Sequence, residues 1–438
     1  MSSNNPIFVI DSDSELSAYH LDIIRSQLLI ALLVVPVLTW GQYEYFNNVY
    51  WNGVDIEVCA NILVEDSTYS IFCQQQVGGP QNLLFRKISV GGEDLGSSFN
   101  EISNSTGFFT HQAESIIQCS NGDFAWAGYE AGTDIDRGIC LRFDDSIFED
   151  DIVWEFGFDS DSIQTTEFYI AFENSEESLF AVGAKHQNVD DDPFLDFSNL
   201  FIVKIGLDGV VLWQSEIDLG FNLFINVSAM KELPTGGYLL FGSVSPDIDN
   251  FICQITEQGD LDWIHTWGTE GIDDGYLWPV AMNDTDFMVA YKSGTQSSSL
   301  VSSGYPHLAL FQSETQQITN DIEYPYFMWG CNVQDLIKCP GGGYCILGNS
   351  SEDSFSDTYS WIIKTDSLGN EEWFRKYYHM ESQPGQFAIL NSLYDIELGL
   401  DGGYICAGYF RDINAVDWPT KSWVLKLDAC GDVEWEGC

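Results

Sequence analysis

The sequence predicts an all-β protein, a seven-bladed β-propeller of four-stranded antiparallel blades, and its internal repeats are the first reason. One strand pattern occurs seven times along the 438 residues. It is clearest in GGYLLFG, GGYCILG and GGYICAG, whose tyrosines are Tyr238, Tyr344 and Tyr404. Weaker copies have their anchors at Tyr69, Phe124, Leu179 and Phe287. Successive anchors are 55, 55, 59, 49, 57 and 60 residues apart, and a period near 50 is typical of a propeller or another repeat array.

The second observation is that each repeat contains four strand-sized segments. In the sixth repeat these are residues 333–338, YCILG, WIIKTD and EEWFRKYY. Short runs of β-branched and aromatic residues, bounded by Gly, Asp, Ser and Asn, predict strands joined by turns. No long helical pattern follows residue 42, so we expect strands throughout residues 42–438.

The third observation is a fixed spacing in the second half of the repeat. The third and fourth strands carry aromatic residues twelve positions apart, in the pairs Phe201 and Trp213, Phe251 and Trp263, Trp361 and Trp373, and Trp423 and Trp435. A glycine lies eight residues after the first member of each pair, where a tight hairpin needs positive φ. We expect each fourth-strand tryptophan to pack between adjacent sheets.

A propeller must also close its ring. Residues 43–50 have the composition of a fourth strand that precedes the first full repeat, so we expect them to pair with the last repeat. Residues 433–438 compete for that position. An open β-solenoid is the alternative architecture, although its repeats are usually shorter and its ends need caps.

The amino-terminal region carries an export signal. Arg25 precedes an apolar run at residues 28–38, and small residues follow at Thr39 and Gly41. Eleven apolar residues suit a signal peptide and are too few to cross a membrane as a helix. We therefore expect residues 1–41 to be a leader plus signal peptide, residues 42–438 to be one propeller domain, and the mature form to lack a transmembrane span. A membrane anchor is the alternative.

The charge of the chain restricts its partners. The 67 acidic and 16 basic residues give a formal net charge of −51. Such a surface repels nucleic-acid phosphates and anionic membranes, so a nucleic-acid partner is not expected. The excess charge is interpreted as a solvated coat, with cation binding as the alternative. Two acidic loops could supply oxygen ligands to calcium, although neither has the EF-hand pattern. Their candidate ligands are Asp159, Asp161, Asp190, Asp191 and Asp192.

The eleven cysteines indicate a compartment that permits disulfides, namely the periplasm, the cell surface or the extracellular space. Three pairs flank short turns and are predicted to form disulfides: Cys430 with Cys438, Cys59 with Cys73, and Cys339 with Cys345. Cys140 and Cys253 lie inside apolar strands and are interpreted as small buried hydrophobic residues.

The repeats resemble those of secreted propeller proteins of Bacteroidota, whose units read approximately DGGYxLAG followed by WxxKxDxxGNxxW. The resemblance rests on the three GGY segments, WIIKTDSLGNEEW and WVLKLDACGDVEW. It implies a propeller exported by the type IX secretion route. Members of this group commonly carry a carboxy-terminal sorting domain, whereas this sequence ends at the segment that usually precedes it.

A catalytic motif is not evident. The six histidines are scattered, and HExxH, GxSxG and Walker motifs do not occur. The third-to-fourth strand turn is similar to sialidase Asp boxes, but Arg86 and Arg142 occupy the third-strand position of Lys204, Lys364 and Lys426, so they follow the repeat.

Loop lengths predict the binding face. The loops between second and third strands and between repeats are the long ones, and in a propeller both sets emerge on one side, here called the long-loop face. Tyr305 and Trp418 are the candidate binding residues there. We expect an exported, noncatalytic propeller that binds a protein or a glycan through this face. A secreted hydrolase or lyase acting on polysaccharide is the alternative, and a passive envelope scaffold is a second alternative.

Overall fold

The computed structural model describes residues 45–433 except for fourteen short segments, which are residues 52–55, 77–80, 104–106, 109–112, 132–136, 145–151, 159–163, 188–196, 221–224, 245–248, 269–273, 295–302, 354–355 and 416–417. Tyr45–Cys438 forms one compact unit, separate from Met1–Glu44. The predicted leader and signal peptide, residues 1–41, lie outside the described residues. No helix within the described part of the chain is long and apolar enough to cross a membrane.

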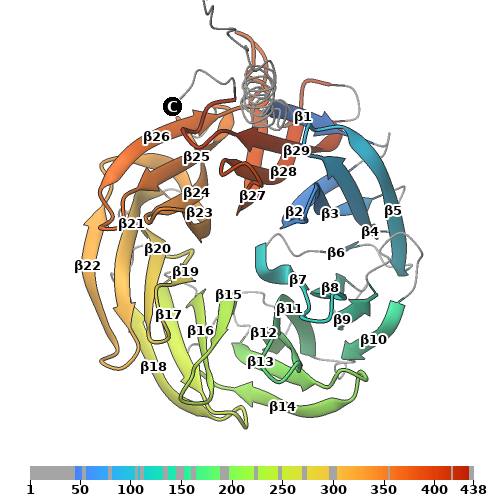
Figure 1. The fold of residues 1–438 in the computed structure, drawn as a ribbon, viewed down its shortest axis with the longest axis vertical. Helices are drawn as coiled ribbons and strands as arrows, with labels where there is room; N and C mark the ends of the chain where they lie inside the picture. The colour runs from blue at the N-terminus through green and yellow to red at the C-terminus, as the bar shows by residue number, and fades with distance from the viewer. Residues whose placement is uncertain are drawn as a thin grey trace, which may run out of the picture. The chain divides into compact units, whose positions relative to one another are not determined.

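The described part of this unit is all-β, and its strands form antiparallel groups arranged around a common centre (Figure 1). The first group contains β2 (Ile56–Val64), β3 (Thr68–Gln76), β4 (Gln81–Ser89) and β5 (Asp94–Ser103). The next contains β6 (Gly107–Phe108), the 3-10 helix η1 (Ala113–Ser115), β7 (Ile116–Gln118), β8 (Phe124–Ala131), β9 (Arg137–Phe143) and β10 (Ile152–Phe158). It is followed by β11 (Gln164–Glu173), β12 (Leu179–Gln187), β13 (Phe197–Ile205) and β14 (Val211–Ile217).

The second half of the chain repeats the arrangement. Its groups comprise β15 (Ile225–Glu232), β16 (Tyr238–Val244), β17 (Asp249–Ile255) and β18 (Leu261–Trp267), then β19 (Trp278–Ala281), β20 (Asp286–Gly294), β21 (Ser303–Gln312) and β22 (Gln317–Glu323). They continue with β23 (Met328–Lys338), β24 (Tyr344–Ser351), β25 (Thr358–Thr365) and β26 (Glu371–Tyr377), and end with β27 (Ile389–Leu398), β28 (Tyr404–Asp412) and β29 (Thr420–Leu427). Four-stranded antiparallel sheets around one centre are the architecture of a β-propeller, as the sequence predicts.

Two of the sheets are larger because neighbouring groups touch. A single parallel pair, Ile56 with Thr420, joins β2 to β29 and makes one eight-stranded sheet. The other eight-stranded sheet is joined only where β21 meets β23, at Ser303 with Trp329 and Gly304 with Met328. Each large sheet therefore consists of two four-stranded groups with a short connection.

The strand that joins the two ends of this unit is β1 (Phe46–Tyr50). It pairs antiparallel with β29, from Phe46 opposite Lys426 to Tyr50 opposite Ser422. The last group thus takes its fourth strand from the amino-terminal side of the chain. The predicted pairing of residues 43–50 with the last repeat is confirmed for Phe46–Tyr50, and this closed arrangement is not an open solenoid.

The fourth-strand tryptophans pack against the turn of the following group. A Cβ atom added to Gly259 would lie 2.6 Å from Trp213 Cζ3, and one added to Gly431 would lie 2.8 Å from Trp373 Cη2. Both glycines have positive φ, of 85° and 80°. These turns therefore need glycine for two reasons, namely backbone conformation and the indole beside it. The expected packing of the tryptophans between sheets is confirmed at these positions.

The core lies between successive groups rather than at the centre of the ring. One cluster packs Phe180 and Ile202 against Leu240 and Phe251, across the interface between the third and fourth groups. Another contains Trp361, which is fully buried. This is the expected result when both faces of each sheet are covered by a neighbouring sheet.

The first strands of the last two groups, β23 and β27, each contain a bulge that positions an aspartate side chain. In β27 the register shifts between Leu393 and Asp395, and in β23 it shifts between Val333 and Asp335. The glycine opposite each bulge is in close contact with the bulged strand, because a Cβ atom on Gly408 would lie 1.9 Å from the Ser392 carbonyl oxygen. A bulge changes the face to which the following side chains point. Asp335 and Asp395 therefore lie at matching positions of successive groups.

Candidate functional site

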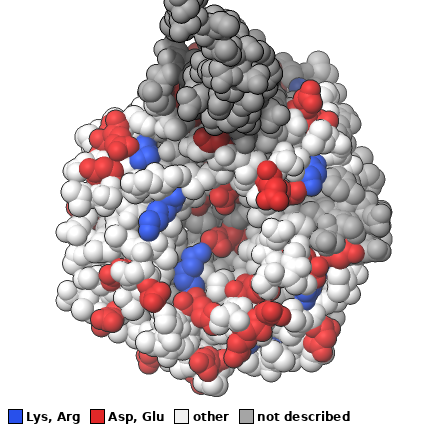
Figure 2. Space-filling view, in the orientation of Figure 1, with Lys and Arg blue, Asp and Glu red and all other residues white. Residues whose placement is uncertain are grey.

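A cavity of about 650 Å³ lies where the first strands of several groups converge, beside the short turns between first and second strands. We call it the carboxylate cavity, because Glu114, Asp335, Asp395 and Glu397 are among its lining residues. Figure 2 shows acidic side chains in and around a hollow near the middle of the molecule. The innermost strands thus supply carboxyl groups to a common space.

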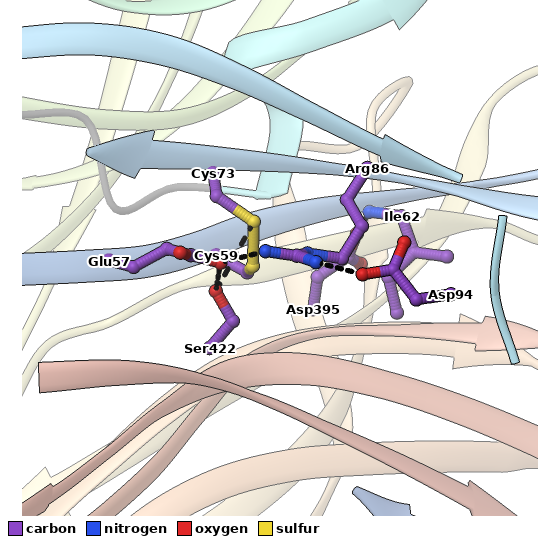
Figure 3. The surroundings of a disulfide bond; sticks show 8 residues. All are labelled: Glu57, Cys59, Ile62, Cys73, Arg86, Asp94, Asp395 and Ser422. Carbon is purple, nitrogen blue, oxygen red and sulfur yellow. Dashed lines mark hydrogen bonds and ion pairs between the residues drawn. A yellow bond between two sulfur atoms is a disulfide. The ribbon is translucent and has the colours of Figure 1, made fainter. Parts of the chain in front are cut away.

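Two of these carboxyl groups also bind the edges of neighbouring first strands. Asp395 Oδ2 accepts a hydrogen bond of 2.6 Å from the Ile62 amide (Figure 3), and Asp335 Oδ2 accepts one of 3.1 Å from the Ile396 amide. These amides belong to the free edges of innermost strands, which would otherwise lack partners in a buried place. The two aspartates therefore join successive groups as well as lining the cavity.

The carboxyl groups that line the cavity have raised pKa values. Asp335 and Asp395 are neighbouring buried carboxyl groups that interact with each other, so it is unfavourable for both to be ionised. Burial raises the pKa of Asp335 to about 6, and burial together with the charge of Asp335 raises the pKa of Asp395 well above its ordinary value. Burial, followed by the charge of Asp335, raises the pKa of Glu397 to about 7. At neutral pH the cavity therefore holds both protonated and ionised carboxyl groups.

Two lysines also line the cavity. Lys231 Nζ lies 3.0 Å from Glu114 Oε1, so its charge is largely balanced by that carboxylate, and Lys338 lies at the end of β23. No arginine is present among the described lining residues. The third-strand cations instead form ion pairs within the sheets: Arg86 with Glu57 and Asp94, Arg142 with Asp123, Lys204 with Glu176, Lys364 with Glu372, and Lys426 with Asp401. Their regular position is structural.

The predicted binding residues Tyr305 and Trp418 do not line this cavity. The half-buried Tyr305 ring lies 5.5 Å from the Phe327 ring, whose other neighbour is Trp329 at 6.4 Å. Trp418 is 57% exposed, and its carbonyl oxygen accepts a hydrogen bond from Arg411. Tyr305 thus belongs to a small aromatic cluster, and Trp418 lies on a different strand group.

The predicted calcium ligands cannot be placed. Asp159, Asp161, Asp190, Asp191 and Asp192 all lie outside the described residues. Within the described ranges, no group of three or more His, Cys, Asp or Glu side chains is arranged to hold a metal ion. Calcium binding by these loops stays a prediction.

One of the three predicted disulfides is confirmed. Cys59 and Cys73 are opposite each other in β2 and β3 and are bonded (Figure 3). Beside them, Arg86 Nη2 lies 2.8 Å from Glu57 Oε1, which also accepts a hydrogen bond of 2.5 Å from Ser422 Oγ. The disulfide thus lies next to a buried ion pair at the junction of the first and last groups.

The prediction for Cys339 and Cys345 is wrong in this structure. Both are free and buried, with their Sγ atoms 3.2 Å apart. Cys339 ends the first strand, while Cys345 lies within β24 opposite Ile337, so the two residues are diagonal neighbours and not a directly opposed pair like Cys59 and Cys73. Cys430 is disulfide-bonded, and its predicted partner Cys438 lies outside the described residues.

The carboxylate cavity was missed by sequence reasoning, although one signal pointed to it. Asp335 precedes the anchor Tyr344 by nine residues, and Asp395 precedes the anchor Tyr404 by the same nine residues. Residues at the same phase of a closed repeat lie at the same height around the centre. Two aspartates at one phase therefore predict neighbouring carboxyl groups.

Comparison with known proteins identifies no family. No family model and no curated protein matches the chain. Among solved structures, the polysaccharide lyase Uly1 has a TM-score of 0.47 at 10% identity, over 88% of this chain and 92% of that chain. An α-L-arabinanase of Penicillium chrysogenum has a TM-score of 0.44 at 12% identity, over 71% and 92%. The β-propeller domain of the trilobed protease of Pyrococcus furiosus has a TM-score of 0.42 at 8% identity, over 90% and 100%. With TM-scores below 0.5, none of these likenesses assigns a family or an activity to this chain.

Proposed function

We propose that the chain hydrolyses a neutral polysaccharide at the carboxylate cavity. The observation that carries this proposal is a set of three neighbouring carboxyl groups whose pKa values are all raised by burial: Asp335, Asp395 and Glu397. Proton transfer is most effective when the pKa of the catalytic group lies near the working pH. Glycoside hydrolysis needs one protonated and one ionised carboxyl group on either side of the bond that breaks.

The roles follow from the protonation states. Glu397, with a pKa of about 7, donates its proton to the glycosidic oxygen as the bond from the anomeric carbon to that oxygen breaks. Asp335, with a pKa of about 6, is ionised at pH 7 and accepts a proton from the water whose oxygen bonds to the anomeric carbon. Asp395 keeps its own proton, so that Asp335 is ionised beside a neutral carboxyl group.

The charge of the cavity favours a neutral substrate over a uronate. A lyase that eliminates across a uronate ring must neutralise the carboxylate of the substrate, which requires an available cation. Of the two lysines that line the cavity, Lys231 is paired with Glu114, so Lys338 would have to neutralise the substrate in the presence of Asp335, Asp395 and Glu397. The formal net charge of −51 would also repel a polyanionic chain. Hydrolysis therefore suits this cavity better than elimination.

The proposal also includes the number of blades and the export of the protein. The four-stranded groups, with β1 completing the last, would be the seven blades of one closed propeller. The resemblance to secreted Bacteroidota propellers supports export, possession of a signal peptide at residues 1–41, and type IX secretion. The Cys59–Cys73 disulfide is also in keeping with an oxidising compartment.

Incubation with a panel of neutral and uronate-containing polysaccharides tests the reaction. New reducing ends from a neutral polysaccharide are expected, without the ultraviolet absorbance of an unsaturated product. Glu397→Gln and Asp335→Asn should each lower the rate at least about a hundredfold, the usual size of an acid or base contribution. Glu381→Gln, at an exposed carboxylate outside the cavity, should not change it. Unsaturated products, or equal rates in all three variants, would refute the proposal.

Binding without turnover is the second candidate function. The cluster of Tyr305, Phe327 and Trp329 favours it, because Phe327 is 45% exposed and aromatic rings stack on sugars. Retention on a polysaccharide column that is lost in Phe327→Ala, with no product from any substrate, would favour this function over hydrolysis.

A further inference from the structure

A second cavity, of about 360 Å³, lies nearer the beginning of the first strands than the carboxylate cavity. Asn332 and Gln334 of β23 line it, whereas the following residue, Asp335, lines the carboxylate cavity. Its other walls include Tyr129, Tyr169, Tyr276 and Tyr394. No described lining residue is Asp, Glu, Lys, Arg or His, in sharp contrast to the acidic surface of the chain. We call it the amide cavity.

Hydrogen bonds between strand groups hold the walls of the amide cavity in place. Trp278 Nε1 donates a bond of 3.1 Å to the Val333 carbonyl oxygen, and Ser228 Oγ donates to the Leu277 carbonyl oxygen. These two bonds connect β15, β19 and β23 across three successive groups. The cavity is therefore built by the junction of innermost strands and does not depend on a mobile loop.

Tyr276 is held in the left-handed region, with φ of 64°. This conformation is unfavourable for a residue with a bulky side chain, and such strain is retained where the surroundings over-determine it. Lys292 Nζ lies 5.2 Å from the centre of the Tyr276 ring, and the two groups form a cation–π interaction. The ring is thus fixed as part of the wall.

Asn332 supplies a hydrogen-bond acceptor that is not used within the protein. Its Oδ1 atom is buried and has no hydrogen-bond partner among the described residues. An unpaired buried carbonyl oxygen is unfavourable unless a ligand or a water molecule donates to it. Asn332 is also one of the residues that line the cavity. Asn332 therefore marks the place where a donor from a bound molecule is expected.

We propose that the amide cavity binds a neutral saccharide. Tyrosine rings offer apolar faces to the C–H surface of a sugar, while amide groups exchange hydrogen bonds with its hydroxyl groups. A sugar hydroxyl is a suitable donor to Asn332 Oδ1. No cationic side chain is among the described lining residues, and Lys292 is buried against the Tyr276 ring, so a phosphate or carboxylate group would have no direct ion pair here and would bind poorly. The volume of 360 Å³ is within the range of small-ligand sites. This site is distinct from the carboxylate cavity and does not require that hydrolysis occurs there.

Saturation-transfer NMR on the whole chain tests the proposal, with cellotriose, maltotriose, mannotriose and xylotriose as neutral probes and trigalacturonate as the acidic probe. At least one neutral trisaccharide should give transfer, and trigalacturonate should give none. Hydrolysis would appear separately as product signals, so that its absence leaves the binding result intact. Transfer to none of the neutral probes, or equal transfer to the acidic one, would overturn the proposal.

Two variants assign the binding to this cavity. Asn332→Leu keeps the approximate size of the side chain and removes its amide, so the dissociation constant should rise about tenfold. Tyr276→Gly removes a ring and relieves the left-handed strain, which offsets part of the lost packing, so this variant should still fold but bind more weakly. Gln317→Leu, an exposed amide on β22, is the matched control and should bind as the parent does. Parental affinity in both cavity variants would contradict the assignment.

Discussion

The Tyr50 hydroxyl group donates a hydrogen bond of 2.6 Å to the Gly92 carbonyl oxygen. Tyr50 is the last residue of β1, and Gly92 lies in the turn between β4 and β5, so this bond crosses from the last group to the first. Phe46, at the other end of β1, lies against the same glycine, because a Cβ atom there would be 2.6 Å from its ring. The glycine turn is thus covered by both ends of the closing strand.

The same contact recurs between other groups. Tyr377 OH donates to the Gly431 carbonyl oxygen over 2.8 Å, and Tyr324 OH donates to the Gly369 carbonyl oxygen over 2.9 Å. In each case a residue at or just beyond the end of an outer strand binds the equivalent turn of the following group. The junction made by β1 is therefore of the same kind as the junctions inside the chain.

Tyr50→Phe should destabilise the fold by about 1 kcal/mol, because it removes one buried hydrogen bond and leaves the Gly92 carbonyl oxygen with the longer bond, of 3.2 Å, from Asn48 Nδ2. Tyr377→Phe, which removes the equivalent bond elsewhere, is the matched control and should have a similar effect. Deletion of residues 46–50 should lower the melting temperature far more than either substitution and should promote association through the exposed edge of β29. Thermal unfolding and light scattering measure both effects. A deletion without effect would show that β1 does not close the ring in solution.

Gly259→Ala should destabilise the protein more than Gly402→Ala. Both glycines have nearly the same positive φ, 85° and 82°, so both substitutions carry a backbone cost of about 1 to 2 kcal/mol. At Gly259 the added Cβ atom also meets Trp213, whereas at Gly402 there is nothing within 4 Å. The difference, about 1 to 3 kcal/mol for overpacking, can be measured by denaturant unfolding. Trp213→Leu in the Gly259→Ala background should recover part of this extra loss of stability. Equal losses of stability in Gly259→Ala and Gly402→Ala would contradict the packing of Trp213 against Gly259.

Stability should fall as the pH rises from about 4.5 to about 7, in part because of Glu397. Its pKa is raised from 4.5 to about 7 by burial, so the folded state binds more protons than the unfolded state within this window. The stabilisation is complete below pH 4.5 and is lost as the pH passes 7. Melting temperatures of Glu397→Gln should therefore depend less on pH than those of the parent. Glu381→Gln should keep the parental slope, and a Glu397→Gln curve parallel to the parental one would contradict the raised pKa.

Cysteine mapping should separate bonded from free thiols. After denaturation without a reductant, Cys339 and Cys345 should react with an alkylating reagent, whereas Cys59 and Cys73 should not. Replacing Cys59 and Cys73 together by alanine should cost about 3 kcal/mol, the chain-entropy value for a loop of this length. Peptide mass mapping gives the pairing. Recovery of a Cys339–Cys345 peptide would restore the disulfide that the sequence predicts.

The strands could be predicted closely because local patterns specify them. The anchors Tyr238, Tyr344 and Tyr404 each begin a second strand, as do the weaker anchors Phe124 and Leu179. The turn glycines could be recognised because positive φ excludes most other residues. The fourth-strand tryptophans could be recognised because their spacing from those glycines is constant. These features depend on short-range geometry that every repeat must satisfy.

The candidate site could not be predicted in the same way. Asp335 and Asp395 are 60 residues apart, and each follows a one-residue bulge that no local pattern indicates. Without the bulge, strict alternation would place these side chains on the opposite face of the strand. Their raised pKa values depend on burial by neighbouring groups and, for Asp395, on the charge of Asp335, which are properties of the closed ring.

The antiparallel pairing of β1 with β29 decides how the molecule resists tension. Phe46 is opposite Lys426, so the chain enters β1 beside the point where it leaves β29. A force that pulls residues 45 and 433 apart therefore loads the hydrogen bonds of this pair one after another, as in a zipper, instead of all at once. The ring should open at low force at this seam, before any other strand group is disturbed. A ring closed in this manner should therefore be mechanically weak at one defined place, the pair of β1 with β29.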